Sequence, residues 1–250
     1  VSKAGLGRDI YDVMNSAFRK VLAGIGMATV GANAIFAAIT GSSIASASVF
    51  TKISVPEMLR YNYNKRFAVG VVAGSSVLGM IIPPSAMLII YSFISEQSVG
   101  DMFLAGIVPG LILTASYIMA IFAMARLWPT FIGENIKVDT MLALSASKMV
   151  HKAWPVVALI VLVLGGIYTG WLTPVEAGAA GASLALIVAA FRRSMSWKGF
   201  WSTLVETGHI TAAILLLITM ASFYSRMLGF AGLPNELDAL LQTWDLSFFK

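Results

Sequence analysis

Two stretches of the sequence decide the fold: AITGSSIASASVFTKISVPEM at residues 38–58 and LGMIIPPS at residues 78–85. Each stretch places polar or helix-breaking residues within a long run that has no charged side chain, residues 21–51 and 67–95. As a single helix, the first run would be about 46 Å long, whereas the hydrocarbon core of a bilayer is about 30 Å thick. Neither run is therefore predicted to cross a membrane as one straight helix.

The composition of the whole chain indicates an integral membrane protein. The 250 residues are 58% hydrophobic and only 12% charged, and the mean hydropathy is +0.83, whereas soluble domains contain about 25% charged residues. The net charge of +5 comes from basic residues spread between apolar blocks, which argues against nucleic-acid binding. The absence of cysteine excludes thiolate chemistry, and two distant histidines argue against a metal centre.

Basic residues flank the first uncharged run on both sides: Arg8, Arg19 and Lys20 before it, and Lys52, Arg60, Lys65 and Arg66 after it. Because basic loops stay on the cytoplasmic side, both ends of this run are expected there, and the run must enter the membrane and return. We interpret residues 21–52 as a re-entrant helical hairpin with its tip at Gly41, Ser42 and Ser43. Non-helical backbone at membrane depth lines a cavity or is buried in protein, so the tip is a candidate functional site.

The second run is broken by Pro83 and Pro84, which have no amide hydrogen to donate. Backbone carbonyls at residues 79–82 therefore lose their helical partners, and we expect them to face the hairpin tip. Such a cage of oxygen atoms without a carboxylate suits Na⁺, which unwound carbonyls bind in secondary transporters. Each break also has a purely structural explanation. The serines could be small residues that allow close helix packing and bind nothing, and the prolines could kink a helix without forming a site.

The remaining segments predict an all-α polytopic membrane protein built from inverted repeats. Residues 1–20 form an amphipathic inner arm helix, and the acidic residues 233–250 form an outer arm helix, as two inverted repeats would produce. Residues 53–126 hold the broken helix and a following span that is interrupted at Pro109 and Gly110. Residues 127–152 are a cytoplasmic loop, and residues 153–232 are scaffold helices of the second repeat.

Three further polar residues within the apolar runs have a local interpretation. Asn33 and Thr40 lie in the hairpin, where they either line the cavity or form helix–helix hydrogen bonds. Glu176 follows Thr173 and Pro174, a pattern that is typical of a capped helix start.

Several motifs in collinear order resemble the large membrane subunit (DctM-like permease) of tripartite ATP-independent periplasmic (TRAP) transporters. Beside the two stretches quoted above, these are GLGRDIYD at residues 5–12, NKRFAVGVVAG at 64–74 and GGIYTGWLTPVEAGAAGA at 165–182. The chain departs from the usual family pattern at TPVEA, where TPTEA is common. It also has Ser76 and Val77 where Gly-Thr is usual, so a threonine hydroxyl is absent there.

The resemblance implies an elevator-type, Na⁺-driven importer of organic acids in the bacterial inner membrane, with Na⁺ as coupling ion and no other cofactor. Implied partners are a small membrane subunit (DctQ-like) and a periplasmic substrate-binding protein (DctP-like). The Na⁺-binding residues would be Gly41, Ser42, Ser43, Gly79, Ile82 and Pro83, and the residues near the substrate Ser42, Ser43, Pro84 and Ser85. The family also has scaffold helices before, and a second hairpin and broken helix after, the matched region. We therefore expect this chain to be an internal part of a larger subunit.

Other classes of function fit the residues less well. An intramembrane enzyme is disfavoured because GxSG, HExxH and paired intramembrane aspartates are absent. A passive channel would need one polar face repeated around an oligomer, whereas this chain has two separate breaks. A dicarboxylate/Na⁺ symporter-type carrier, working without a binding protein, shares the logic of the hairpin and the broken helix. It is distinguished by Asn-Thr at the tip, where this chain has Ser42 and Ser43.

Overall fold

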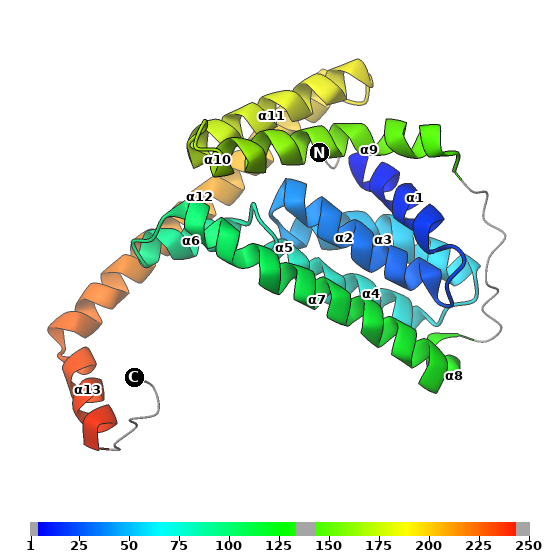
Figure 1. Cartoon of the computed structure of the whole chain (residues 1–250). Coiled ribbons are helices and arrows are strands. Elements are labelled where there is room, and N and C mark those ends of the chain that lie inside the picture. Colours follow the sequence, from blue (N-terminus) through cyan, green and yellow to red (C-terminus); the bar gives the residue numbers. More distant parts are fainter. Residues whose placement is uncertain (1–4, 134–143, 244–250) are drawn as a thin grey trace. The chain divides into compact units, whose positions relative to one another are not determined.

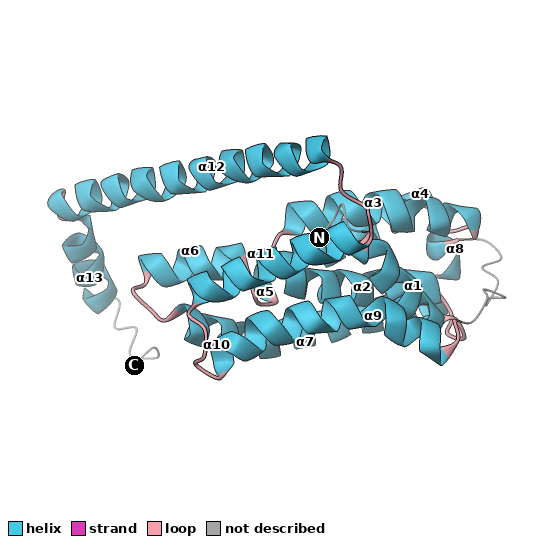
Figure 2. Ribbon diagram, turned by 90° about the horizontal axis from the view of Figure 1, so that it is seen from above, coloured by secondary structure: helices cyan, strands magenta, loops and turns pink. Residues whose placement is uncertain are grey.

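A computed structural model of the chain describes residues 5–133 and 144–243, whose regular secondary structure is entirely helical (Figures 1 and 2). The prediction of an all-α fold is thereby confirmed. The chain divides into two compact units, Val1–Met195 and Ser196–Lys250. The first unit contains both predicted breaks, and the described residues of the second form a long helix and a short one.

The first unit begins with an amphipathic helix and a helical hairpin, α1 (Leu6–Phe18), α2 (Gly24–Thr40) and α3 (Ser43–Arg60). The apolar side of α1, including Leu6 and Ile10, is buried, and α1 packs against α2. In the hairpin, the rings of Phe36 and Phe50 meet edge to face at 5.5 Å and help to hold its two helices together. Helix α3 continues to Arg60, past residue 52, where the hairpin was predicted to end. The charge of Lys52 does not interrupt the helix, because its side chain lies on the exposed face.

The broken helix follows the hairpin as α4 (Lys65–Ser76), α5 (Leu78–Ile81) and α6 (Ala86–Ile94), with a bend of 42° at the break. The next helices are α7 (Val99–Leu127) and α8 (Pro129–Ile132). Our expectation of an interruption at Pro109 and Gly110 was wrong, because α7 runs through both residues. Gly110 instead permits close packing, since a Cβ atom there would lie 2.7 Å from the Ile82 side chain.

The rest of the first unit consists of α9 (Ala146–Ile160), the π-helix η1 (Val161–Gly165), α10 (Gly166–Tyr168) and α11 (Pro174–Phe191). Helix α9 begins inside the segment predicted as a loop, of which residues 134–143 lie outside the described residues. The start of α11 has a complete capping box: Thr173 Oγ1 accepts from the Glu176 amide, and the Glu176 carboxylate accepts from the Thr173 amide. The prediction that Glu176 supports a capped helix start is confirmed.

The second unit contains α12 (Trp197–Phe230) and α13 (Leu233–Thr243). Ser196 begins α12 by accepting the amide hydrogen of Gly199 at 3.1 Å. Helix α13 falls within the predicted outer arm, whose residues 244–250 lie outside the described residues.

Four helical segments in the described part of the chain are long and apolar enough to cross a bilayer: Val99–Leu127, Ala146–Tyr168, Pro174–Phe191 and Trp197–Phe230. The bent pair formed by Lys65–Ile81 and Ala86–Ile94 makes a fifth if it counts as one span. This number of apolar helices agrees with the predicted polytopic membrane protein.

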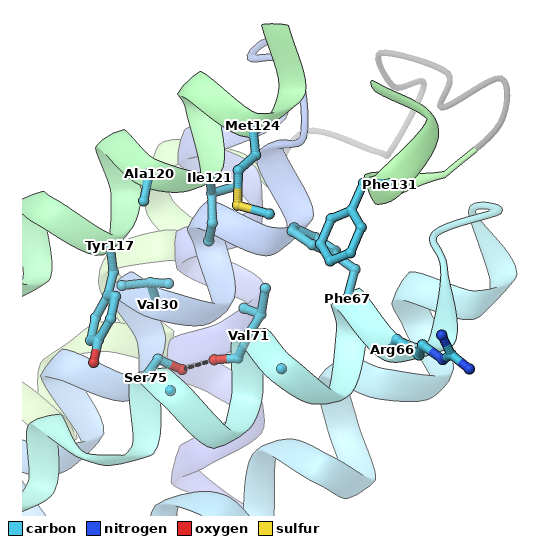
Figure 3. A pocket seen from close by; sticks show the side chains of 12 residues that line it. Val30, Arg66, Phe67, Val71, Ser75, Tyr117, Ala120, Ile121, Met124 and Phe131 are labelled. Carbon is cyan, nitrogen blue, oxygen red and sulfur yellow. Dashed lines mark hydrogen bonds between the residues drawn. The ribbon is translucent and has the colours of Figure 1, made fainter. Parts of the chain in front are cut away.

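An apolar groove of about 210 Å³ lies between α4 and α7, beside Val30 of α2 (Figure 3). Its walls are mostly hydrocarbon, with the aromatic rings of Phe67 and Phe131 near the end where Arg66 lies. Ser75 and Tyr117 lie at the opposite end.

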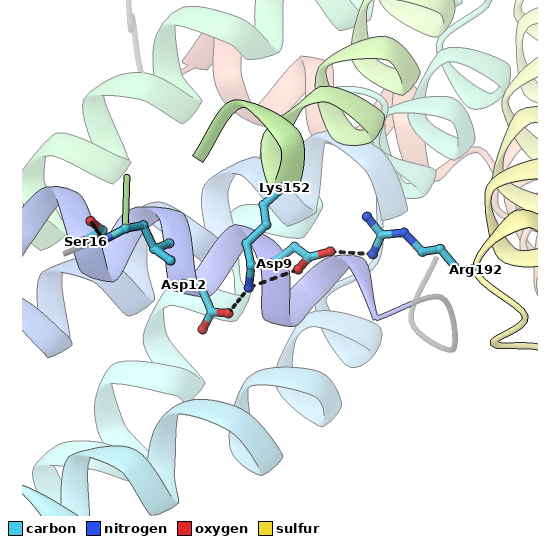
Figure 4. Close-up of polar contacts among 6 residues, drawn as sticks. Asp9, Asp12, Ser16, Lys152 and Arg192 are labelled. Atoms are coloured by element: carbon cyan, nitrogen blue, oxygen red, sulfur yellow. Dashed lines mark hydrogen bonds and ion pairs between the residues drawn. The ribbon is translucent and has the colours of Figure 1, made fainter. Parts of the chain in front are cut away.

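Ion pairs connect α1 with α9 and α11, two helices that follow much later in the sequence (Figure 4). Lys152 of α9 lies 3.3 Å from the Asp9 carboxylate and also pairs with Asp12. Arg192, the C-cap residue of α11, pairs with the same Asp9, whose side chain is only 15% exposed. One carboxylate of the inner arm therefore joins both α9 and α11 to α1.

Candidate ion and substrate site

The hairpin tip is a two-residue turn whose first residue requires glycine. Gly41 has φ +59°, in the left-handed region, and its amide donates to the Ala37 carbonyl at 2.9 Å to end α2. A Cβ atom on Gly41 would lie 2.3 Å from the Pro84 carbonyl oxygen. Ser42 is the N-cap of α3, and its Oγ accepts the Ala45 amide hydrogen at 3.3 Å. The conformation thus disfavours a side chain at residue 41, and the close contact with Pro84 excludes one.

The break in the second helix leaves carbonyls without helical partners. Helix α5 ends where the Ile82 amide donates to the Leu78 carbonyl at 2.8 Å. Pro83 and Pro84, joined by a cis peptide bond, then offer no amide hydrogen to the carbonyls of Gly79 and Met80. The buried Ser85 hydroxyl donates to the Met80 carbonyl at 2.6 Å. The Gly79 carbonyl consequently remains free of its usual helical bond.

The tip and the break lie in direct backbone contact. A Cβ atom on Gly79 would lie 2.8 Å from both the Ser42 carbonyl carbon and the Ser43 nitrogen. The Ala86 amide, at the start of α6, donates to the Gly41 carbonyl at 3.2 Å rather than continuing a helix from α5. The two interruptions therefore form one structure, in which glycines permit the approach.

Four helix ends converge on this structure. The carboxyl ends of α2 and α5 bring carbonyl oxygens with partial negative charge, and the amino ends of α3 and α6 bring amides with partial positive charge. The residues of the tip and the break, 41–43 and 82–85, have no charged side chain. No cluster of three or more potential metal-binding side chains of His, Cys, Asp or Glu occurs among the described residues. Any ion held here would be bound by backbone and hydroxyl oxygens.

The structure brings all the sequence-predicted site residues together around the tip and the break. Gly41, Gly79, Pro83 and Ser85 are buried, and Ser42, Ser43, Ile82 and Pro84 are half-buried. Of these residues, Ile82 and Pro83 also approach α7, near the positions that Gly110 and Gly106 leave open. Their roles in binding stay a prediction.

Sequence reasoning missed Ser46, which lies one helical turn after Ser42. Its side chain is fully buried, and its Oγ has no hydrogen-bond partner. A buried hydroxyl without a partner is costly and often indicates a missing ligand or water. The sequence did offer a signal for Ser46. It follows Ser42, the N-cap of α3, by four residues, and this spacing places both serines on the same side of the helix.

The structure shows the predicted helix–helix hydrogen bond for one of the two polar residues of α2. The Asn33 amide donates to the Ser75 hydroxyl at 2.6 Å, and both side chains are buried, so Asn33 connects the hairpin to α4. The Thr40 hydroxyl donates to the Phe36 carbonyl of its own helix at 2.9 Å. Only Asn33 therefore forms a hydrogen bond between helices, and neither alternative for Thr40 is decided by its bond.

Comparison with known proteins shows the family of the chain. The family described as tripartite ATP-independent periplasmic transporter, DctM component, matches residues 1–249. The chain belongs to this family. The C4-dicarboxylate TRAP transporter large permease protein DctM of Pseudomonas aeruginosa is 32% identical over 99% of the chain and 57% of the relative. The resemblance seen in the motifs is thereby confirmed.

Other relatives in the TRAP transporter family carry different substrate names. The ectoine/5-hydroxyectoine large permease UehC of Ruegeria pomeroyi is 31% identical over 86% of the chain and 49% of the relative. The sialic acid large permease SiaM of Vibrio cholerae is 26% identical over 95% of the chain and 55% of the relative. The chain thus spans about half the length of these curated relatives. All three are transporter permeases, which points to a protein that is not an enzyme.

Proposed function

We propose that this chain forms part of the large membrane subunit of a Na⁺-coupled TRAP importer of organic acids. The observation that supports this function most strongly is the backbone contact between the tip and the break, at Gly79 against Ser42 and Ser43. Paired breaks near the membrane midplane are where secondary transporters bind their substrate and coupling ions.

Na⁺ is the cation that best suits the oxygen atoms available at this contact. The Gly79 carbonyl lacks its helical partner, the Ser46 hydroxyl is buried without one, and Ser42 and Ser43 add two more hydroxyls nearby. Neutral oxygen donors without carboxylates suit a monovalent hard cation better than a divalent one, since the latter is usually held by acidic side chains.

A carboxylate substrate would be recognised by the amino ends of α3 and α6. The first turns of α3 and α6 present backbone amides where the helix dipole favours negative charge. In α6 these are the amides that follow Ala86, because the Ala86 amide itself donates to the Gly41 carbonyl. Three relatives' names specify C4-dicarboxylates, ectoine and sialic acid, all of which carry a carboxylate, and a fourth name specifies isethionate, whose anionic group is a sulfonate. We propose an organic acid of this general class, in a site to which Ser42, Ser43, Pro84 and Ser85 contribute.

We further propose that the subunit lies in the bacterial inner membrane and works with a small membrane subunit and a periplasmic binding protein. Family membership supports this assembly. The test is uptake of succinate, ectoine and sialic acid into proteoliposomes that contain the intact subunits, with and without the binding protein. Uptake that does not need a binding protein would instead favour a symporter-type carrier.

The ion site is tested by substituting Ser42→Leu in the intact subunit. We expect loss of Na⁺-dependent uptake with normal membrane insertion, because the larger side chain would occupy the space between tip and break. The matched control is Ser48→Leu, at an exposed position of the same helix. Wild-type Na⁺ dependence in the Ser42 variant would overturn the assignment of the tip.

A further inference from the structure

We propose that the groove between α4 and α7 binds one acyl chain of an anionic phospholipid from the cytoplasmic leaflet, with its headgroup at Arg66. The groove is separate from the tip and the break, and its lining residues include none of the proposed ion ligands. The proposal stands on the shape of the groove, its depth in the membrane and the charge at its end.

Two glycines of α4 leave space along one side of the groove because they have no side chain. Gly70 and Gly74 lie one turn apart on α4, and a Cβ atom added to either would meet no other atom within 4 Å. The opposite wall includes Ala120 and Met124 of α7. A continuous apolar space therefore runs along α4, bounded by helices that are parts of candidate membrane spans.

The length of the groove matches one leaflet. From Arg66 to Ser75 the helix rises about 14 Å, which is close to half of the roughly 30 Å hydrocarbon core. Figure 3 shows Arg66 at one end and Ser75 with Tyr117 at the other. An acyl chain that enters beside Arg66 would therefore end near the middle of the bilayer.

The charge at the entrance selects the lipid. Lys65 and Arg66 are exposed at the start of α4, and no acidic side chain of the described residues lies within ion-pairing distance of either. Arg126 and Trp128 lie at the end of α7, which the basic loops assign to the same cytoplasmic side. A long arginine side chain at an interface can reach the phosphate while its stem covers apolar surface.

The test measures phospholipid bound to the intact, purified subunit by native mass spectrometry, in detergent mixed with phosphatidylglycerol or phosphatidylcholine. We expect Gly70→Leu to abolish bound lipid, because its side chain would extend into the groove from a Cβ position that has no other atom within 4 Å. The matched control is Gly208→Leu, at another helical glycine with open space around it. Equal lipid retention in these two variants would overturn the proposal.

The headgroup assignment is tested separately with Arg66→Gln. We expect the preference for phosphatidylglycerol over phosphatidylcholine to fall about fivefold, the usual effect of one basic residue near an anionic surface. Arg66→Lys should keep the preference, and Lys52→Gln, at an exposed position on α3, should not change it. An unchanged preference in Arg66→Gln would contradict the role of this arginine.

A photoreactive amino acid at Ala120 distinguishes lipid from protein in the groove. Ala120 is exposed and lines the space directly. In membranes, we expect the crosslinked product to be a phospholipid. A crosslink to another segment of the subunit, or to the small subunit, would show that protein covers the groove and would overturn the proposal.

Discussion

Replacing Gly79 with alanine tests whether the close contact between tip and break is needed for ion coupling. Glycine to alanine within a helix usually stabilises it by about 1 kcal/mol, because alanine loses less backbone freedom on folding. At residue 79 the new methyl group would lie 2.8 Å from two backbone atoms of the tip, which must retreat to at least 3.4 Å. Overpacking of this kind costs about 1–3 kcal/mol.

Gly74→Ala is the internal control, because its Cβ atom meets open space and should cause no clash. The difference in unfolding free energy between the two variants should therefore be about 1–3 kcal/mol, with Gly79→Ala the less stable. It is measured by denaturant titration of the intact subunit in detergent micelles. We also expect Gly79→Ala to need more Na⁺ for half-maximal uptake in proteoliposomes, while Gly74→Ala keeps the wild-type requirement. Equal stability and equal Na⁺ dependence would refute the reasoning that this contact builds the site.

Three further predictions concern contacts outside the tip. Asp9→Asn removes the carboxylate shared by Lys152 and Arg192 and should lower the unfolding free energy by about 1–3 kcal/mol in denaturant titration. Ser75→Ala leaves the buried Asn33 amide without a partner and should cost about 1–3 kcal/mol, with part of the loss recovered when Asn33→Ala is added in a double-mutant cycle. Burial raises the pKa of Tyr63 from 10.0 to about 12, so the stability that its neutral phenol contributes is complete below pH 10 and lost between pH 10 and 12. Tyr63→Phe should remove that part of the alkaline loss in a pH series of thermal unfolding, and an unchanged profile would contradict it.

The sequence predicted the two breaks because both are encoded locally. Gly41 supplies a left-handed helix end, and two consecutive prolines end α5 whatever they contact. The same logic failed at Pro109 and Gly110, where the helix continues through a single proline. There, Gly110 leaves room for the side chain of Ile82 in the break after α5, and sequence periodicity carries no information about such a contact. A proline or glycine in an apolar run therefore does not by itself show whether the helix ends there. The two true breaks differ in that they contact each other in the fold.

Within the site, the same distinction separates residues that could be predicted from those that could not. No residue type identifies a backbone carbonyl that binds an ion, but consecutive prolines mark where carbonyls lose their helical partners. The candidate ion site was therefore predicted from Pro83 and Pro84. The buried hydroxyl of Ser46 and the bond between Asn33 and Ser75 depend on how α2, α3 and α4 pack, which no single helix determines. The pairing of Asp9 with Arg192 likewise joins residues that are 183 positions apart. Hydroxyl and amide side chains within an apolar helix need hydrogen-bond partners. Each polar residue in an uncharged run of the sequence therefore predicts a contact that a structure can test.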